Sequence, residues 1–367
     1  MRSTAGEHEV FVQSTGEDGG RFRLYVDERL VFDNWDVTRA LTSTARLTLG
    51  ATPHKVVLEQ KGRSAWLGAK LRMGFVRVGT VVPEELKRMA AKADAVVVAA
   101  GFDAETESEG ADRTFSLPTG QDELINEMAT ANRNTVVVIT SGGGTDMSGW
   151  VERVPAVLQA WFPGQEGGTA LAEILLGDVN PSGRLPVTFE RRWEDNPVHA
   201  SYYPASDTSK RVEYKEGVFV GYRGYEKNNT KPLFPFGHGL SYTTFKYDNL
   251  KVTPVPGTVT DAPDGPHFEV SFDVKNTGNR EGSDVAQVYV SDTHASVPRP
   301  PKELKGFSKV TLRPGESRRV TLLLDWRAFS YYDAAAKHWR ADPGDFGILV
   351  GRSSEQIELR GSAPFGK

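Results

Sequence analysis

The sequence contains no cysteine among its 367 residues, so disulfide bonds and thiolate metal sites are excluded. Histidine is also scarce. The seven histidines are scattered along the chain without the HxH or HExxH spacing that zinc sites use. We therefore expect neither a metal ion nor a cofactor.

Long apolar runs and an excess of basic charge are missing as well. No stretch of eighteen apolar residues occurs, and the opening MRSTAGEHEVFVQS lacks the apolar centre of a signal peptide. The 44 basic and 48 acidic residues give a formal net charge of -4, with no basic stripe for a phosphate backbone. We expect a soluble chain without a membrane or nucleic-acid partner, cytoplasmic or secreted depending on what precedes Met1.

The length of the chain implies several domains, because single hydrophobic cores stop growing well below this size. Residues 1–80 show the alternation of β-strands, with a hairpin predicted around Asp27 and Glu28. About four strands are recognisable, which is few for a closed sandwich. This segment is predicted to be half of a β-domain, with an uncovered apolar face.

Residues 81–190 change from a period of two to alternating helices and apolar strands. PEELKRMAAKA, GQDELINEMATAN and QEGGTALAEILLG have helical patterns, whereas DAVVVAAG, TVVVITSG and AVLQAWF are continuous apolar runs. Strands without polar alternation are typical of a parallel sheet that helices cover on both faces. We predict a doubly wound, mostly parallel α/β sandwich domain.

The remaining chain is predicted to form a connecting segment and a second β-domain. Residues 191–265 are rich in proline, tyrosine, glycine and charge, and are predicted to form an ordered connecting segment. Residues 266–367 alternate again in HFEVSFDVKN, DVAQVYVSD, RRVTLLLDW and FGILVG, separated by turn sequences. They indicate an immunoglobulin-like β-sandwich, so the predicted fold class is multidomain α/β plus β.

An acidic loop follows the strand DAVVVAAG. FDAETESEGADR places five carboxylates within ten residues: Asp103, Glu105, Glu107, Glu109 and Asp112. Ligands of doubly wound sheets bind outside the carboxyl ends of the strands, and clustered carboxylates raise one another's pKa, as a general acid requires. A solvated surface loop has the same composition. The residues alone leave both interpretations open.

The stretch ESEGADRTFSLPTGQDELI resembles the acid/base loop of family 3 glycoside hydrolases, in which an EG.DR...LP..Q pattern follows the strand. The similarity continues through NTVVVITSGG, VLQAWFPGQEGGTALAEILLGDVNPSGRLPVTF, VFVGYRGYE and LFPFGHGLSYTTF, and covers residues 83–250. The C-terminal sandwich resembles the fibronectin type III-like domain of many such enzymes. RFRLYVDERLVFDNW resembles the second half of an inserted protective-antigen-like β-sandwich.

This resemblance implies a retaining glycoside hydrolase that acts on β-glucosides or related β-glycosides. Glu109, directly before Gly110, matches the general acid/base of the family, with Glu107 and Glu105 as alternative positions. The family's nucleophile is an Asp on an N-terminal barrel. This chain has no such barrel, so we expect it to need a missing N-terminal barrel domain or chain. Substrate-binding residues and homo-oligomer formation stay open.

Other residues have structural and functional interpretations. Asp112 and Arg113 are expected to hold the shape of the loop, and GGGTD lacks the lysine of a phosphate-binding loop. Six aromatic residues are expected to pack in cores or interfaces: Trp150, Trp161, Phe162, Tyr222, Tyr225 and Tyr242. The alternative to an enzyme is a non-catalytic carbohydrate-binding or scaffold protein.

Overall fold

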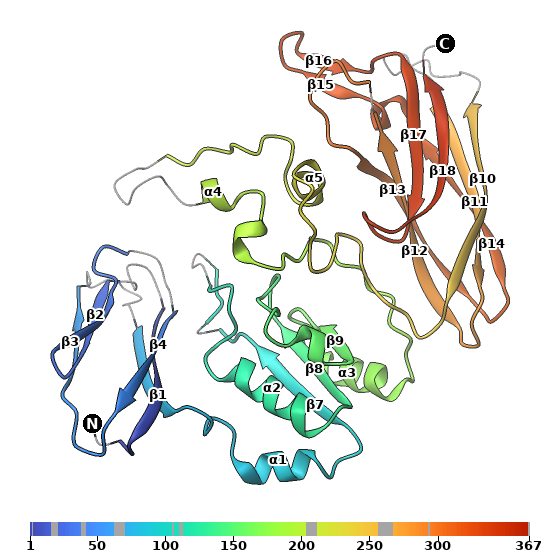
Figure 1. Ribbon diagram of the computed structural model, residues 1–367. Helices are drawn as coiled ribbons and strands as arrows, with labels where there is room; N and C mark the ends of the chain where they lie inside the picture. The colour runs from blue at the N-terminus through green and yellow to red at the C-terminus, as the bar shows by residue number, and fades with distance from the viewer. Residues whose placement is uncertain are drawn as a thin grey trace. The chain divides into compact units, whose positions relative to one another are not determined.

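The computed structural model describes residues 1, 3–15, 21–37, 42–61, 70–104, 106–109, 113–202, 211–255, 267–292 and 294–365 (Figure 1). The chain divides into two compact units. The first contains Met1–Gly167 and Tyr203–Glu213, and the second contains Gly168–Tyr202 and Tyr214–Lys367. A β-sandwich and a parallel α/β layer form the first unit. A connecting segment and a larger β-sandwich form the second.

The first unit begins with two antiparallel three-stranded sheets, of order β4-β1-β6 and β3-β2-β5. Their strands are β1 (Gly6–Thr15), β2 (Phe22–Val26), β3 (Arg29–Asp33), β4 (Thr42–Leu49), β5 (Val56–Gln60) and β6 (Lys70–Arg77). The predicted hairpin joins β2 to β3. Asp27 and Glu28 in its turn have positive φ angles of 49° and 65°, as tight hairpin turns often require.

This sandwich encloses its own core. Val10 and Val12 of β1 are fully buried, together with Phe22 and Leu24 of β2. The uncovered apolar face predicted for residues 1–80 is therefore wrong, and so is the estimate of about four strands. β4 was difficult to recognise because only three of its eight residues are apolar, so its alternation is weak.

The same unit continues into a parallel sheet of order β7-β8-β9, as predicted. Its elements in chain order are α1 (Glu84–Ala90), β7 (Val96–Gly101), α2 (Gln121–Ala131), β8 (Thr135–Thr140), the short 3₁₀ helix η1 (Val151–Arg153) and β9 (Ala156–Gln159). α2 contacts β7 and β8, and α1 packs against α2. Because all three strands run in one direction, the loops that follow them leave at the same edge of the sheet.

Burial differs between the central and the outer strand of this sheet. Val137, Val138 and Ile139 of β8 are buried in succession, so both faces of the central strand are covered, as predicted. β7 alternates instead, with Val98 buried and Val97 52% exposed. Within the first unit taken by itself, one face of β7 is therefore exposed.

The second unit starts with a segment of short helices, which begins at Gly168, earlier than the predicted 191–265, and which we call the connecting segment from here on. They are α3 (Gly167–Leu176, whose first residue belongs to the first unit), the 3₁₀ helix η2 (Trp193–Asp195), α4 (His199–Tyr202) and α5 (Tyr222–Lys227). An isolated antiparallel bridge pairs Phe189 with Phe234 within this segment. The connecting segment was predicted to extend to residue 265, but a strand begins at Phe245.

The C-terminal sandwich packs a three-stranded sheet, β10-β11-β14, against a four-stranded sheet, β13-β12-β17-β18. Its elements are β10 (Phe245–Val255), β11 (His267–Asn276), β12 (Gly282–Ser291), β13 (Glu303–Leu312), β14 (Ser317–Leu324), the 3₁₀ helix η3 (Trp326–Ala328), β15 (Tyr331–Asp333), β16 (His338–Arg340), β17 (Gly344–Gly351) and β18 (Ile357–Phe365). The predicted sandwich is confirmed. β10 pairs with β11, so the sandwich begins at Phe245 and not at residue 266.

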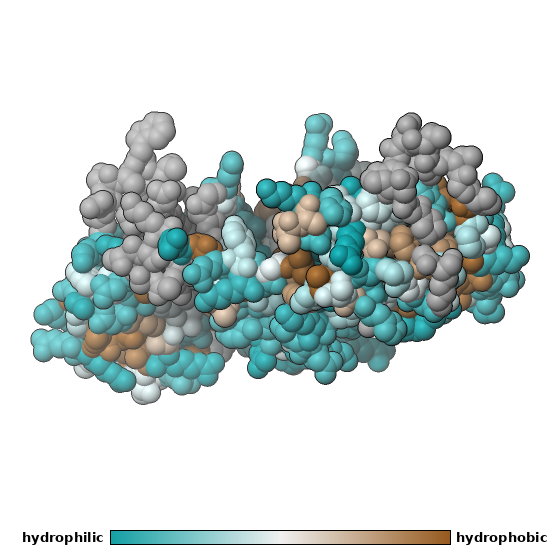
Figure 2. Space-filling view, turned by 90° about the horizontal axis from the view of Figure 1, so that it is seen from above, coloured by the Kyte–Doolittle hydropathy of each residue, from teal (hydrophilic) through white to brown (hydrophobic). Residues whose placement is uncertain are grey.

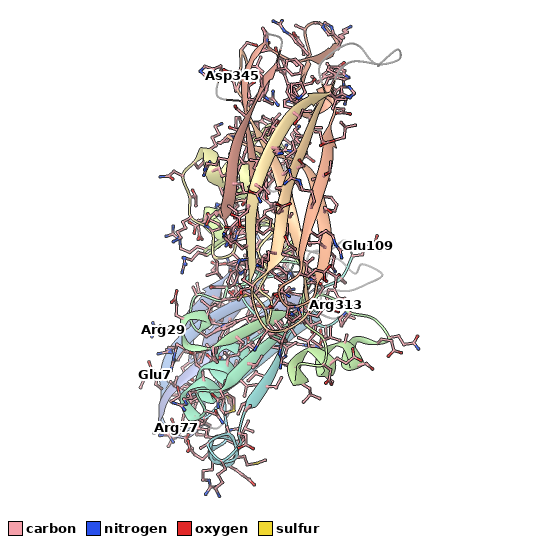
Figure 3. All side chains as sticks on the ribbon, turned by 90° about the vertical axis from the view of Figure 1, so that its right-hand side faces the viewer. Glu7, Arg29, Arg77, Glu109, Arg313 and Asp345 are labelled. Atoms are coloured by element: carbon pink, nitrogen blue, oxygen red, sulfur yellow. The ribbon has the colours of Figure 1, made fainter. Side chains whose placement is uncertain are left out.

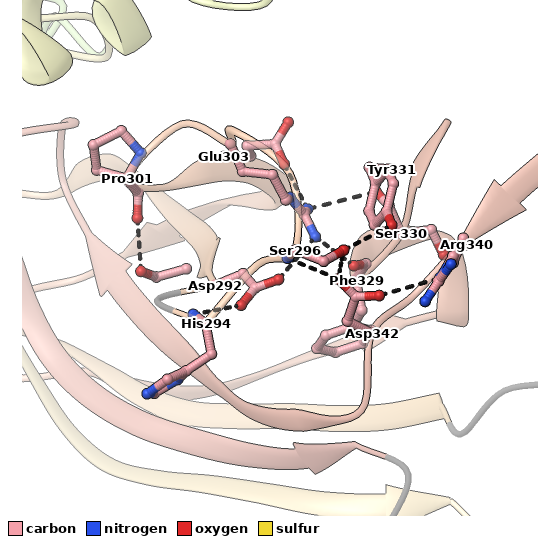
Figure 4. Close-up of polar contacts among 12 residues, drawn as sticks. Asp292, His294, Ser296, Pro301, Glu303, Phe329, Ser330, Tyr331, Arg340 and Asp342 are labelled. Atoms are coloured by element: carbon pink, nitrogen blue, oxygen red, sulfur yellow. Dashed lines mark hydrogen bonds and ion pairs between the residues drawn. The ribbon is translucent and has the colours of Figure 1, made fainter. Parts of the chain in front are cut away.

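Arg299, a buried arginine, organises the loop between β12 and β13. Figure 4 labels its partners Asp292, Glu303 and Phe329. Arg299 donates to the backbone carbonyl of Phe329 at 2.7 Å, and its guanidinium forms ion pairs with Asp292 at 3.3 Å and Glu303 at 2.8 Å. Nearby, the Asp342 carboxylate accepts a backbone hydrogen bond from this loop. Because the fork of Arg299 satisfies several acceptors at once, the loop is held without a disulfide.

A second buried network joins the connecting segment to this sandwich. Asp284 on β12 has no exposed surface and forms an ion pair with Arg184 of the connecting segment. It also pairs with Arg352 at 3.2 Å and accepts the Tyr247 hydroxyl at 3.1 Å. Arg184 donates in addition to the carbonyl of Gly239. Removing one partner of a buried ion pair is costly, so this network fixes the connecting segment on the sandwich.

Candidate active site

Backbone contacts at the carboxyl end of β7 position the acidic loop. Gly101 has a φ angle of 133°, and a Cβ there would lie 2.0 Å from the carbonyl oxygen of Thr140. Only glycine allows β7 to approach β8 this closely. The side-chain amide of Gln121 accepts the N–H of Gly101 at 2.7 Å and donates to its carbonyl at 2.9 Å. Gln121 thus bonds to the end of β7 as a neighbouring strand would.

The first acid of the loop closes a turn. The Asp103 carboxylate accepts both the N–H of Thr106, at 3.0 Å, and its hydroxyl, at 2.8 Å. The Asp103 N–H in turn donates to the Thr106 hydroxyl at 2.9 Å. Asp103 therefore stabilises the local backbone. Glu105, the next acid of the cluster, lies outside the described residues.

Glu107 connects the acidic loop to the loop that follows β8. Both of its carboxylate oxygens lie 3.1 Å from the N–H of Gly142, and Arg113 Nε donates to Oε1 at 3.1 Å. Arg113 also donates to the carbonyl of Gly144 at 2.7 Å. The guanidinium lies 4.7 Å from the centre of the Phe102 ring. Arg113 holds the loop, as predicted, whereas its predicted companion Asp112 lies outside the described residues.

Glu109 differs from these neighbours. Its side chain is exposed and makes no hydrogen bond or ion pair with the other residues that the structure describes. Figure 3 shows it extending from the loop. Of the three acids described between positions 103 and 109, Asp103 and Glu107 hold the loop and Glu109 presents a free carboxyl group.

The glycine-rich loop after β8 already has its backbone bonded within the chain. The N–H of Gly142 donates to Glu107, and the carbonyl of Gly144 accepts from Arg113. The Ser141 hydroxyl donates to the carbonyl of Gly143 at 2.7 Å. These contacts connect GGGTD to Glu107, Arg113 and Ser141.

Asp122 is an unusual acid that the sequence analysis did not single out. It occupies the first turn of α2 and accepts the indole N–H of Trp150 at 2.9 Å. Burial raises the pKa of its carboxyl group to about 6, with smaller contributions from the charges of Glu123 and Asp146. In the sequence it resembles any acid that favours a helix start. Only its burial reveals the difference.

The aromatic residues near this edge behave differently from one another. Trp150 is fully buried, so its predicted packing role is confirmed. Trp161 is half-buried and has a positive φ angle of 56°, an uncommon conformation for a bulky residue. Phe162 is 53% exposed in this chain, so its predicted packing is wrong here. A Cβ at Gly142 would lie 3.6 Å from the Phe162 ring, which places Phe162 beside the loop after β8.

The three tyrosines belong to the second unit. Tyr225 is buried, and the Tyr222 ring stacks on Phe236 at 4.9 Å while its hydroxyl accepts the N–H of Leu304 at 2.9 Å. Both agree with core and interface roles. Tyr242 is about half exposed, and its hydroxyl donates to the carbonyl of Ile174 at 2.8 Å.

The described residues contain neither a metal-binding group nor a membrane-length helix. No group of three or more histidine, aspartate or glutamate side chains among them is arranged to hold a metal ion. Nor does any described helix combine the length and apolarity needed to cross a bilayer. On the face shown in Figure 2, hydrophobic residues form small separate groups within a largely hydrophilic surface.

Family comparisons agree with the motifs of the acidic loop. Residues 36–242 match the glycosyl hydrolase family 3 C-terminal domain, and residues 284–354 match the fibronectin type III-like domain. Thermostable beta-glucosidase B of Acetivibrio thermocellus is 47% identical over 279 residues, covering 76% of this chain and 36% of that protein. A beta-glucosidase of Rhizobium radiobacter is 40% identical over 375 residues, covering 95% of this chain and 44% of that protein.

The solved structures that resemble this chain include further beta-glucosidases. The beta-glucosidase of Kluyveromyces marxianus, in complex with glucose, matches 99% of this chain with a TM-score of 0.71 and 34% identity. DesR, a beta-glucosidase from Streptomyces venezuelae in complex with D-glucose, matches with the same TM-score, identity and coverage of this chain. This chain spans less than half the length of these relatives. It belongs to glycosyl hydrolase family 3, of which it contains the C-terminal domain followed by a fibronectin type III-like domain.

Proposed function

We propose that this chain supplies the general acid/base of a retaining hydrolase of β-glucosides or related β-glycosides, and that Glu109 is that residue. The observation that carries the proposal is the exposed carboxyl group of Glu109, which has no partner among the described residues, on a loop that Asp103 and Glu107 hold in place. Its position directly before Gly110, in a stretch similar to the family's acid/base loop, supports the assignment. So does the similarity to beta-glucosidases.

Retaining hydrolysis needs two carboxyl groups about 5 Å apart on opposite sides of the glycosidic bond. In the first step Glu109 protonates the departing oxygen while a carboxylate attacks the anomeric carbon. In the second step Glu109 removes a proton from the water that hydrolyses the glycosyl-enzyme intermediate. We propose that the nucleophile is an Asp of an N-terminal barrel domain outside these 367 residues. That domain also forms most of the sugar subsites in this proposal.

The test uses the complete enzyme with its barrel. A general acid matters most when the leaving group is a strong base, so Glu109→Gln should slow alkyl glucosides or disaccharides by about 100-fold or more. It should affect an activated aryl glucoside less in the glycosylation step. Azide attacks the intermediate without a general base, and should therefore restore turnover of the variant, with a glycosyl azide of retained configuration as product.

Glu85→Gln is the matched control, because Glu85 is an exposed glutamate in the first turn of α1. It should have unchanged kinetics and no response to azide. If azide rescues Glu107→Gln and leaves Glu109→Gln inactive, the acid/base is Glu107. Sugar binding by the complete protein without any turnover would instead favour the non-catalytic alternative.

A further inference from the structure

Glu107 bonds the acidic loop to the loop that follows the neighbouring strand β8 through a charged side chain. Its carboxylate accepts the N–H of Gly142, which follows β8, and the Nε–H of Arg113, which follows the acidic cluster. The Glu107 and Arg113 side chains are both largely buried. A largely buried carboxylate whose oxygens accept from N–H donors fixes the backbone on which it lies.

We propose that Glu107 is a positioning residue for Glu109, an inference that rests on the function proposed above. Glu109 follows two residues after Glu107, and its own side chain has no partner among the described residues. Among the described residues, the backbone that precedes Glu109 is what holds its carboxyl group in place. Glu107 ties that backbone to Gly142, and the Asp103–Thr106 turn shapes the residues before it.

The arrangement also separates the roles of the two glutamates. The oxygens of Glu107 accept hydrogen bonds from Gly142 and from a guanidinium, so the group serves as an acceptor within the protein. A general acid has to direct a proton to the substrate. Misplacing a reacting group by about 1 Å can cost about 100-fold in rate. Loss of the Glu107 contacts should therefore act on acid catalysis without removing the acid itself.

Gly142→Ala tests this from the opposite loop and leaves every acid in the sequence. The φ angle of Gly142 is not in the positive region, so alanine fits the backbone. Its Cβ would lie 2.6 Å from Glu107 Oε1, so it should displace the carboxylate. Gly149→Ala is the control, because a Cβ there meets no atom within 4 Å. Glu107→Ala removes the same contacts directly.

The measurement is kcat/KM of the complete enzyme for aryl glucosides whose leaving groups range from weakly to strongly basic. Rates are normalised to active sites titrated with a covalent inactivator, which removes any contribution from misfolded protein. Glu107→Ala and Gly142→Ala should both slow the most basic leaving group by about 100-fold and the least basic by less than about 10-fold. Gly149→Ala should match the wild type.

Equal loss for all leaving groups, or no loss, in the Glu107 and Gly142 variants would overturn the positioning role. Glu109→Gln, measured in the same series, keeps this result separate from the proposed function. If Glu109→Gln steepens the leaving-group dependence and the other variants do not, only the positioning inference fails. If Glu109→Gln itself leaves that dependence unchanged, the proposed acid/base assignment fails and the inference fails with it.

Discussion

Replacing Asp122 with asparagine should stabilise the first unit at neutral pH. Asparagine has the shape of aspartate and keeps an oxygen that can accept the indole N–H of Trp150, so the 2.9 Å hydrogen bond can persist. The substitution removes a negative charge that burial disfavours, since the pKa of Asp122 is raised to about 6 from an ordinary value of 3.8. It also removes repulsion from Glu123 and Asp146.

The raised pKa of Asp122 determines the expected size of the stabilisation. Each pKa unit corresponds to about 1.4 kcal/mol, so keeping Asp122 ionised in the folded state costs at most about 3 kcal/mol. Two effects reduce this cost. Partial contact with water screens the charge, and a carboxylate in the first turn of a helix gains about 0.3–1 kcal/mol from the helix dipole. We expect a net stabilisation of about 1–2 kcal/mol from Asp122→Asn at pH 7.5.

The sign of the pH dependence follows from the direction of the shift. Between about pH 4 and 6 the folded state binds more protons at Asp122 than the unfolded state does, so wild-type stability falls as pH rises through this window. The advantage of asparagine should therefore be small at pH 4 and complete at pH 7.5. Native-state amide hydrogen exchange of β8 at the two pH values measures this difference within the first unit. A destabilisation at pH 7.5, or a gain independent of pH, would refute the reasoning, and Asp94→Asn serves as the exposed control.

Three further predictions concern the chain as a whole and each unit. These 367 residues alone should not hydrolyse an aryl β-glucoside, because the proposed nucleophile lies outside them, and robust turnover by the purified chain would contradict the proposed division of roles. The Asp27 carboxylate accepts a hydrogen bond from His54 Nδ1 at 2.5 Å and raises the pKa of His54, so the stabilising contribution of His54 is complete below pH 6.5 and is lost as pH rises through the raised value. His54→Gln should accordingly lower the melting temperature of the N-terminal sandwich more at pH 5.5 than at pH 9, and an equal effect at both would exclude the charged pair as its cause. Arg184→Met should destabilise the second unit by about 3 kcal/mol, because it leaves the buried Asp284 with one cationic partner fewer, as urea unfolding can measure. Arg313→Met should change little, since the Arg313 side chain is 84% exposed, and equal losses in the two variants would argue against the buried pair.

The parallel sheet and the C-terminal sandwich were predictable because their core strands have strong patterns. The strand that contains Val137, Val138 and Ile139 is an unbroken apolar run, and β11 alternates around buried Phe268 and Phe272. β10 was missed because FKYDNLKVTPV contains two lysines and an aspartate, and its pairing with β11 depends on residues distant in sequence. Strand recognition failed where the pattern was weak and the partner was remote.

The location of the candidate site in the acidic loop could be predicted from the sequence, but the role of each acid in that loop could not. Position after a strand indicated the acidic loop, and the similarity to a family indicated Glu109 within it. Nothing in the run of acids distinguishes Glu107, because its partner Gly142 lies 35 residues further on and becomes a neighbour only when β7 and β8 align. For Phe162 the sequence pattern was misleading. An aromatic residue beside an apolar strand is usually buried, but Phe162 lies beyond the end of β9 at Gln159 and is exposed.

The Asp284 network has a practical consequence for dividing this protein into fragments. A boundary at residue 265 would separate β10 from β11 and leave Asp284 without Arg184 and Tyr247. The retained piece would carry a buried anion with one remaining guanidinium and an unpaired β11 edge, both of which promote aggregation during expression. A soluble fragment of the fibronectin type III-like domain should instead start at about Gly168, so that it includes the segment bearing Arg184.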